Sequence, residues 1–222
     1  YSMAGGTVDN CHSTGSVSTT GGLIWETAVV SGTSSILNST NRNNCSGVSG
    51  ECGGIVCQVG TSENYLENCH NYGNISGSYR VGGLVGRSTQ NATAHLTVMR
   101  CSNRGNVTNP GTGNEAVVGG LVGDCSATIT YSYNMGDVDG RANTVAGITA
   151  SGSASYCYNL GTITGGKNTS GARNLTVNGI SSSAPSKCFN AGMVVNYSTG
   201  HAYALSSSGS TDCFNAGDIA AN

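Results

Sequence analysis

The chain has 222 residues, of which only 9% are charged, and its formal net charge at pH 7 is −2. Disordered segments combine low hydrophobicity with high net charge, so a hydrophobic content of 37% excludes disorder. The 9 basic residues are scattered and no run of about 20 apolar residues is present. We therefore expect no nucleic-acid partner and no membrane insertion.

A first short motif, Cys-x-Asn-x-Gly-x-Val/Ile, recurs along the whole chain. Full copies begin at Cys69, Cys101, Cys157, Cys188 and Cys213. In two imperfect copies, Ser13 replaces Asn after Cys11, and Ser132 replaces Cys before Asn134. We interpret Cys45 as the start of a further, degenerate copy.

A second motif, small-Gly-Leu/Ile, alternates with the first. Its central small residues are Gly22, Gly54, Gly83, Gly120, Gly147, Gly179 and Ala204. Two motifs that alternate at roughly 30-residue spacing are typical of a solenoid, in which each repeat buries its apolar face against its neighbours.

The fixed residues of the first motif occupy alternate positions. Alternate residues of a strand share one face, so Cys, Asn, Gly and Val point inward and the variable residues point outward. The sequence therefore predicts an all-β fold: a parallel β-solenoid (β-helix) with about seven to eight coils of roughly 30 residues. Right-handed winding is expected from the handedness of parallel crossovers. Residues 1–222 form a single domain with incomplete first and last coils.

Stacked coils place equivalent residues in columns about 4.8 Å apart. The predicted structural Asn ladder contains Asn71, Asn103, Asn134, Asn159, Asn190 and Asn215, whose amides satisfy one another. The predicted Cys ladder contains Cys11, Cys69, Cys101, Cys157, Cys188 and Cys213. Disulfides such as Cys69–Cys101 and Cys188–Cys213, or a column of buried thiols, both fit this spacing. The motif glycines suit either positive φ angles or a tight interior.

The paired motifs, clearest at Val81 to Gly86 and Val118 to Gly123, resemble the GLUG-motif repeats of bacterial surface proteins. Such repeats occur in large secreted adhesins and beside the protease domain of immunoglobulin-A-cleaving metallopeptidases. The resemblance covers nearly the whole chain. It implies an extracellular location, secreted or on the cell surface, and brings no catalytic residues.

No enzyme activity, cofactor or metal site is expected. The 4 histidines are isolated and none starts a His-Glu-x-x-His zinc motif. Glycosidases use two carboxylates about 5–9.5 Å apart. Asp137 and Asp139 share one face and Asp218 matches Asp137 in a later coil, but we interpret all three as exposed turn residues.

We expect an extracellular structural or adhesive role, with subunits that stack end to end as a fibre or a chain that forms part of a longer surface array. The partners would be further copies of the chain and a host or matrix glycan or protein receptor. Two alternatives stay open: a carbohydrate-binding or carbohydrate-cleaving β-helix, and a repeat region that serves a protease domain elsewhere. Accessible N-x-S/T sequons predict glycosylation at Asn74, Asn91, Asn106 and Asn168.

Overall fold

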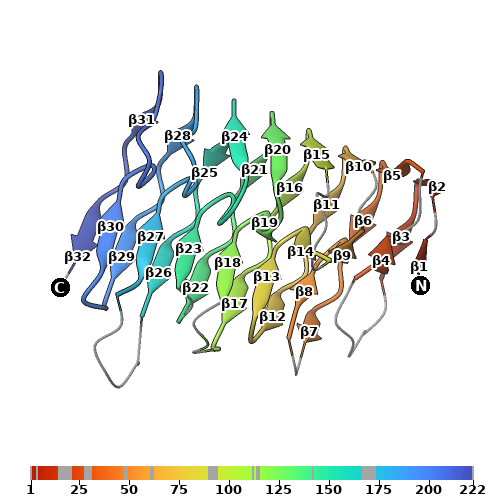
Figure 1. The fold of residues 1–222 in the computed structure, drawn as a ribbon, viewed down its shortest axis with the longest axis horizontal. Helices are drawn as coiled ribbons and strands as arrows, with labels where there is room; N and C mark the ends of the chain where they lie inside the picture. Colours follow the sequence, from red (N-terminus) through yellow and green to blue (C-terminus); the bar gives the residue numbers. More distant parts are fainter. Residues whose placement is uncertain are drawn as a thin grey trace.

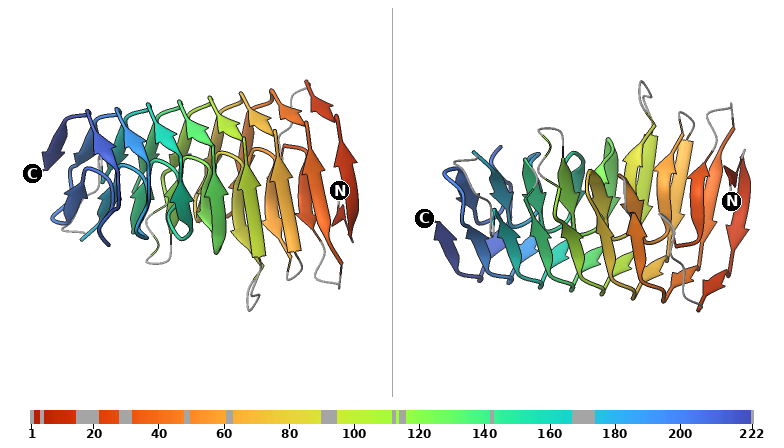
Figure 2. Two further views of the ribbon diagram at one scale, coloured as in Figure 1. Left: turned by 90° about the horizontal axis from the view of Figure 1, so that it is seen from above. Right: turned by 90° about the horizontal axis from the view of Figure 1, so that it is seen from below.

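A computed structural model shows an elongated rod of stacked β-coils, with the N-terminus at one end and the C-terminus at the other (Figures 1 and 2). The structure describes residues 2–3, 5–14, 22–27, 32–47, 50–60, 63–89, 95–111, 113, 116–141, 143–166 and 174–221. These residues form strands and turns and contain no helix. The predicted all-β parallel solenoid is confirmed.

Each coil passes through up to five parallel sheets, which we number I to V in chain order. Sheet I contains β1 (Ser2–Met3), β4 (Ile24–Thr27), β9 (Val56–Val59), β14 (Val85–Ser88) and β19 (Val122–Asp124). Sheet II contains β2 (Gly6–Asp9), β5 (Ser34–Leu37), β10 (Glu63–Glu67), β15 (His95–Met99), β20 (Ala127–Thr130) and β24 (Ser153–Ser155).

Sheet III is the longest and carries the Asn of the first motif. It contains β3 (His12–Ser13), β6 (Thr40–Asn41), β11 (His70–Asn71), β16 (Ser102–Asn103), β21 (Tyr133–Asn134), β25 (Tyr158–Asn159), β28 (Phe189–Asn190) and β31 (Phe214–Asn215).

Sheet IV carries the Val or Ile that ends the first motif. It contains β7 (Cys45–Gly47), β12 (Ile75–Gly77), β17 (Val107–Asn109), β22 (Val138–Gly140), β26 (Ile163–Gly165), β29 (Val194–Asn196) and β32 (Ile219–Ala221). Sheet V contains β8 (Cys52–Gly53), β13 (Arg80–Gly82), β18 (Val117–Gly119), β23 (Thr144–Ala146), β27 (Thr176–Asn178) and β30 (His201–Tyr203). The coils between β4 and β23 contribute a strand to every sheet, and the outer coils contribute to fewer.

The register places equivalent motif residues directly beside each other, and it corrects one interpretation. Cys45 pairs with Ile75 in sheet IV, so it occupies the Val position at the end of a motif copy instead of the Cys position at its start. That copy begins at Ser39 and carries Asn41, which pairs with Asn71. The sequence misled because cysteine fills an apolar position as readily as a valine does.

The buried apolar residues of the core form two clusters. One includes a column made by the Leu or Ile of the second motif, and the fully buried members of this column are Ile55, Leu84, Leu121, Ile148 and Ile180. The other contains the Val and Ile residues of sheet IV together with Cys45. The apolar column predicted from the second motif is therefore present in the structure.

The motif glycines are required by close packing. A Cβ added at Gly105 would overlap the carbonyl oxygen of Gly73 in the preceding coil, and one at Gly161 would overlap that of Gly136. Positive φ angles occur instead one residue before the Cys position, at the corner between sheets II and III. This corner contains Asn10, Asn38, Asn68, Arg100, Tyr131, Tyr156, Lys187 and Asp212, with φ between 49° and 54°. The coil thus turns this corner on a left-handed residue that is never glycine.

Candidate functional site

The predicted Asn ladder residues lie in one column inside sheet III. Each side-chain Nδ2 donates to the Oδ1 of the asparagine in the following coil, over 2.7–2.8 Å, from Asn41 through to Asn215. Asn71, Asn103, Asn134, Asn159 and Asn190 are 0% exposed. Sequence reasoning missed Asn41, because its motif copy has Ser39, Asn43 and Cys45 in place of Cys, Gly and Val.

Each amide also bonds to its own coil. Asn71 Nδ2 donates to the carbonyl oxygen of Gly73 over 2.7 Å, and Asn103 and Asn134 donate in the same way to Gly105 and Gly136. Both amide protons and the carbonyl oxygen are thus engaged, so burial leaves no unmade hydrogen bond. All side chains donate toward the C-terminal end, so the column has one direction.

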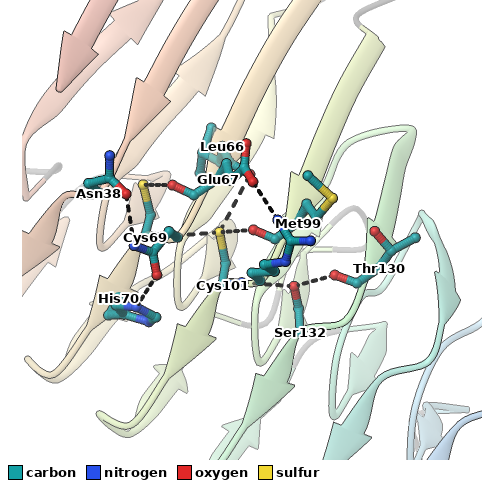
Figure 3. A network of polar contacts seen from close by, with 11 residues as sticks. Asn38, Leu66, Glu67, Cys69, His70, Met99, Cys101, Thr130 and Ser132 are labelled. Carbon is teal, nitrogen blue, oxygen red and sulfur yellow. Dashed lines mark hydrogen bonds and ion pairs between the residues drawn. The ribbon is translucent and has the colours of Figure 1, made fainter.

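The Cys ladder residues lie in a second column at the start of sheet III, which also contains Ser39 and Ser132. Figure 3 shows Cys69, Cys101 and Ser132 of this column. The backbone N–H of Cys69 lies 3.3 Å from Cys101 Sγ, and Cys101 N–H donates to Ser132 Oγ over 3.0 Å. Each thiol or hydroxyl points at the carbonyl oxygen two residues earlier, as in Cys101 Sγ to Met99 O at 3.2 Å. Side-chain sulfur and oxygen atoms of this column therefore accept hydrogen bonds from the backbone N–H groups next to the left-handed corner.

All 10 cysteines are free thiols in this structure. Of the two alternatives for the Cys ladder, disulfides or a column of buried thiols, the structure contains the buried thiols. Burial raises the pKa of Cys45 to about 11 and the pKa values of Cys52 and Cys125 to about 12. Burial also holds the pKa of Cys101 well above its usual range. A hydrogen bond from the Cys157 thiol lowers the pKa of Cys188 to about 7, but Cys188 is only 3% exposed. These thiols act as small, buried hydrogen-bonding groups.

A third column runs along the outside, between sheets III and IV, and includes two of the predicted glycosylation sites. The N–H of Asn106 donates to Asn74 Oδ1 over 2.9 Å, and the N–H of Asp137 donates to Asn106 Oδ1 over 3.1 Å. Both asparagines are exposed, and a glycan on Nδ2 leaves the Oδ1 bonds intact. Asn91 and Asn168 lie outside the described residues.

Two of the candidate carboxylates, Asp137 and Asp218, lie too far apart to act as a pair. Asp137 is exposed, and its Oδ1 accepts a bond from Thr162 N–H over 2.8 Å. Asp218 lies in the same outer column three coils further on, since Val138 aligns with Ile163, Val194 and Ile219 in turn. Three coils correspond to roughly 14 Å, beyond the range of paired-carboxylate chemistry. Asp139, two residues from Asp137, is half-buried in strand β22, so its interpretation as an exposed turn residue is wrong.

Ser102, His70 and Asn68 are arranged like the nucleophile, base and orienting group of a catalytic triad. Its Nδ1 lies 2.8 Å from Ser102 Oγ and its Nε2 lies 3.1 Å from Asn68 Oδ1. Ser102 is 0% exposed, so its hydroxyl does not reach a substrate in this conformation. The arrangement also recurs at His12, whose ring bonds to Thr40 and Asn10. It is therefore a repeated element of coil stacking.

No family model, curated protein or solved structure matches the chain. The resemblance to GLUG-motif repeats accordingly stays a prediction from the motifs. Among the described residues, no helix has the length and apolar character needed to cross a membrane. The same residues contain no cluster of three or more His, Cys, Asp or Glu side chains suited to a metal ion.

Proposed function

We propose that this chain is a structural or adhesive β-solenoid of an extracellular, secreted or cell-surface, protein. The observation that carries the proposal is the unbroken Asn column from Asn41 to Asn215. The same buried hydrogen bond recurs between each pair of neighbouring coils along this column. Such an interior holds a long, regular surface in place and leaves the outward positions free to vary. The resemblance to surface-protein repeats supports the same location.

The proposal includes pairing of the described C-terminal edge with a further coil, supplied by a second copy or by a longer array. Phe214 is 64% exposed and Ile219 is 49% exposed, whereas Val194, which aligns with Ile219 one coil earlier, is 0% exposed. Exposed edges of parallel sheets carry unpaired backbone groups that pair readily with another strand. Contacts that repeat without closing produce filaments.

Imaging and light scattering test this pairing. We expect the purified chain to form rods longer than one copy, which electron microscopy and multi-angle light scattering detect. Ile219→Lys, which places a charge at the inward-facing edge, should shorten them, and Met193→Lys, on an outward position, should not. A chain that stays monomeric at high concentration and forms no fibres would overturn the stacking version.

A further inference from the structure

Aromatic side chains gather on one outer surface of the rod, along sheet III and its corner with sheet II. We call this surface the aromatic stripe; it contains Tyr131, Tyr133, Tyr156, Tyr158, Phe189 and Phe214. Tyr131 is 56% exposed and Tyr156 is 45% exposed. Exposed apolar surface that forms a continuous patch marks an interaction site more often than scattered single residues do.

The rings of the stripe stack in register with the coils. Tyr131 and Tyr156 have ring centroids 4.9 Å apart, and Tyr133 and Tyr158 have centroids 4.7 Å apart with an angle of 4° between the rings. Phe189 continues the second row in the next coil, because it pairs with Tyr158. The result is a flat platform of ring edges and phenol hydroxyls that runs along the rod axis.

Coil stacking alone does not require these rings. In other coils the position of Tyr133 is held by Thr40 and Ser102, with the same backbone pairing. The outward positions of sheet IV are Ser76, Thr108, Asp139, Thr164 and other small or polar residues. Aromatic pairs stacked between neighbouring coils therefore mark this surface, whereas Trp25, Tyr65 and Tyr197 are exposed outside it.

Two cationic side chains flank the platform and donate hydrogen bonds to its tyrosine hydroxyls. Arg104 donates to the hydroxyl of Tyr133 over 3.0 Å, and Lys187 donates to that of Tyr156 over 3.0 Å. Among the described residues, ion pairs join Arg80, Arg87 and Arg100 to carboxylates, and none involves Arg104 or Lys187. Asp212, one coil beyond Lys187 at the same corner, lies outside ion-pair distance of Lys187 but attracts it electrostatically.

A polar groove continues the stripe toward the N-terminal end. It has a volume of about 460 Å³ and is lined by Leu37, Asn38, Glu67, Asn68 and Arg100. Asn38, Asn68 and Arg100 occupy the left-handed corner position that Tyr131 and Tyr156 occupy in the following coils. Amides, a carboxylate and a guanidinium thus lead directly onto the aromatic platform.

We propose that the aromatic stripe binds an acidic polysaccharide, whose chain lies along the rod axis. Sugar rings have apolar faces and hydroxyl edges, which suit exposed phenols and side-chain amides. Arg104 and Lys187 lie three coils apart, which is roughly 14 Å along the rod axis, and they attract the carboxylate or sulfate groups of the chain. This inference rests on the adhesive role proposed above and gives it a ligand class.

Single-stranded nucleic acid also combines stacking with negative charge. The observations favour the polysaccharide, because the chain has a net charge of −2 and few cations along the stripe, whereas nucleic-acid grooves carry many. Nucleic acid is therefore an outcome that the test includes.

Binding to three probes tests the proposal: polygalacturonate as the acidic chain, dextran as the neutral chain, and single-stranded DNA. Tyr131→Asn with Tyr156→Asn removes the rings and keeps residues that the corner already accepts, since Asn38 and Asn68 stand there. Arg104→Gln with Lys187→Asn removes the cations. The matched control is Tyr197→Gln with Arg141→Gln, because Tyr197 is 49% exposed and lies outside the stripe.

We expect each stripe double variant to lose polygalacturonate affinity at least about tenfold, as the loss of about 1.4 kcal/mol would give. The control variant should bind as the parent does, and all three should keep the parent melting temperature within a few degrees. Unchanged affinity in both stripe variants, or tighter binding of DNA or dextran than of polygalacturonate, would overturn the proposal. Rod formation by imaging is scored separately, so a failed structural role and a failed ligand are distinguishable.

Discussion

The two faces of sheet III follow different rules. Inward, almost every coil repeats Cys or Ser, Asn, Gly and Val or Ile, whereas outward the same strands carry His, Thr, Ser, Tyr and Phe. Inward residues bond to, or pack against, the same residue one coil away, so a change in one coil affects two neighbours. Most outward residues have solvent on one side and so vary more freely, although some, such as His70 with Ser102, also join neighbouring coils. The interior thus maintains the rod, and the exterior is free to acquire binding chemistry.

The strongest way to break the interior is to interrupt the Asn column. Asn134→Leu removes the hydrogen-bond partner of three buried groups: Asn103 Nδ2, Asn159 Oδ1 and the carbonyl oxygen of Gly136. We expect a loss of about 4 kcal/mol in the free energy of unfolding, measured by chemical denaturation. The control is the outward neighbour Met135→Ala, expected to cost less than about 0.5 kcal/mol. Similar losses in both variants would contradict the contrast between the faces.

The second prediction concerns the close backbone approach at the motif glycines. Gly161→Ala places a Cβ against the carbonyl oxygen of Gly136, which belongs to the rigid backbone. We expect a loss of about 3 kcal/mol from this overpacking, again by denaturation. Gly50→Ala is the control, since a Cβ there meets nothing within 4 Å. If Gly161→Ala unfolds at the same denaturant concentration as the parent, the coils are not as tightly stacked as described.

A smaller effect tests the Cys column. Ser132→Ala removes the acceptor of Cys101 N–H and the donor to Thr130 O, and we expect a loss of about 1.5 kcal/mol. Ser132→Cys restores the residue that other coils carry and should stay within about 0.5 kcal/mol of the parent. Thermal and chemical unfolding of the pair compare them directly. Equal losses would mean that size, and not hydrogen bonding, governs the position.

The smallest effect is a pH dependence from the buried thiols. A raised pKa means that the folded state keeps the proton that the unfolded thiol loses above pH about 8.5, so this stability is present below that pH and is lost as the pH rises. For Cys45 the loss continues toward its folded pKa of about 11. Cys45→Val introduces the residue found at Val107 and Val138 in the same column. We expect it to make the free energy of unfolding fall less steeply with pH between about pH 8.5 and 10. Identical slopes, measured by urea unfolding under reducing conditions, would contradict this assignment.

By itself, the sequence was enough to predict the parallel solenoid, the inward face of the first motif and the apolar column of the second. Alternation along a strand and recurrence of the motifs are local properties, and they specify which residues share a face. The right-handed winding stays a prediction.

Tertiary structure decided what depends on register between coils. It placed Cys45 at the apolar position and added Ser39 and Asn41 to the columns. It assigned positive φ to the residue before the Cys position of the first motif instead of to the glycine of that motif. It also brought Tyr131 onto Tyr156, and Arg104 onto Tyr133, from different coils. Coil lengths vary, so sequence spacing does not fix these partners; the hydrogen bonds and packing between stacked coils do.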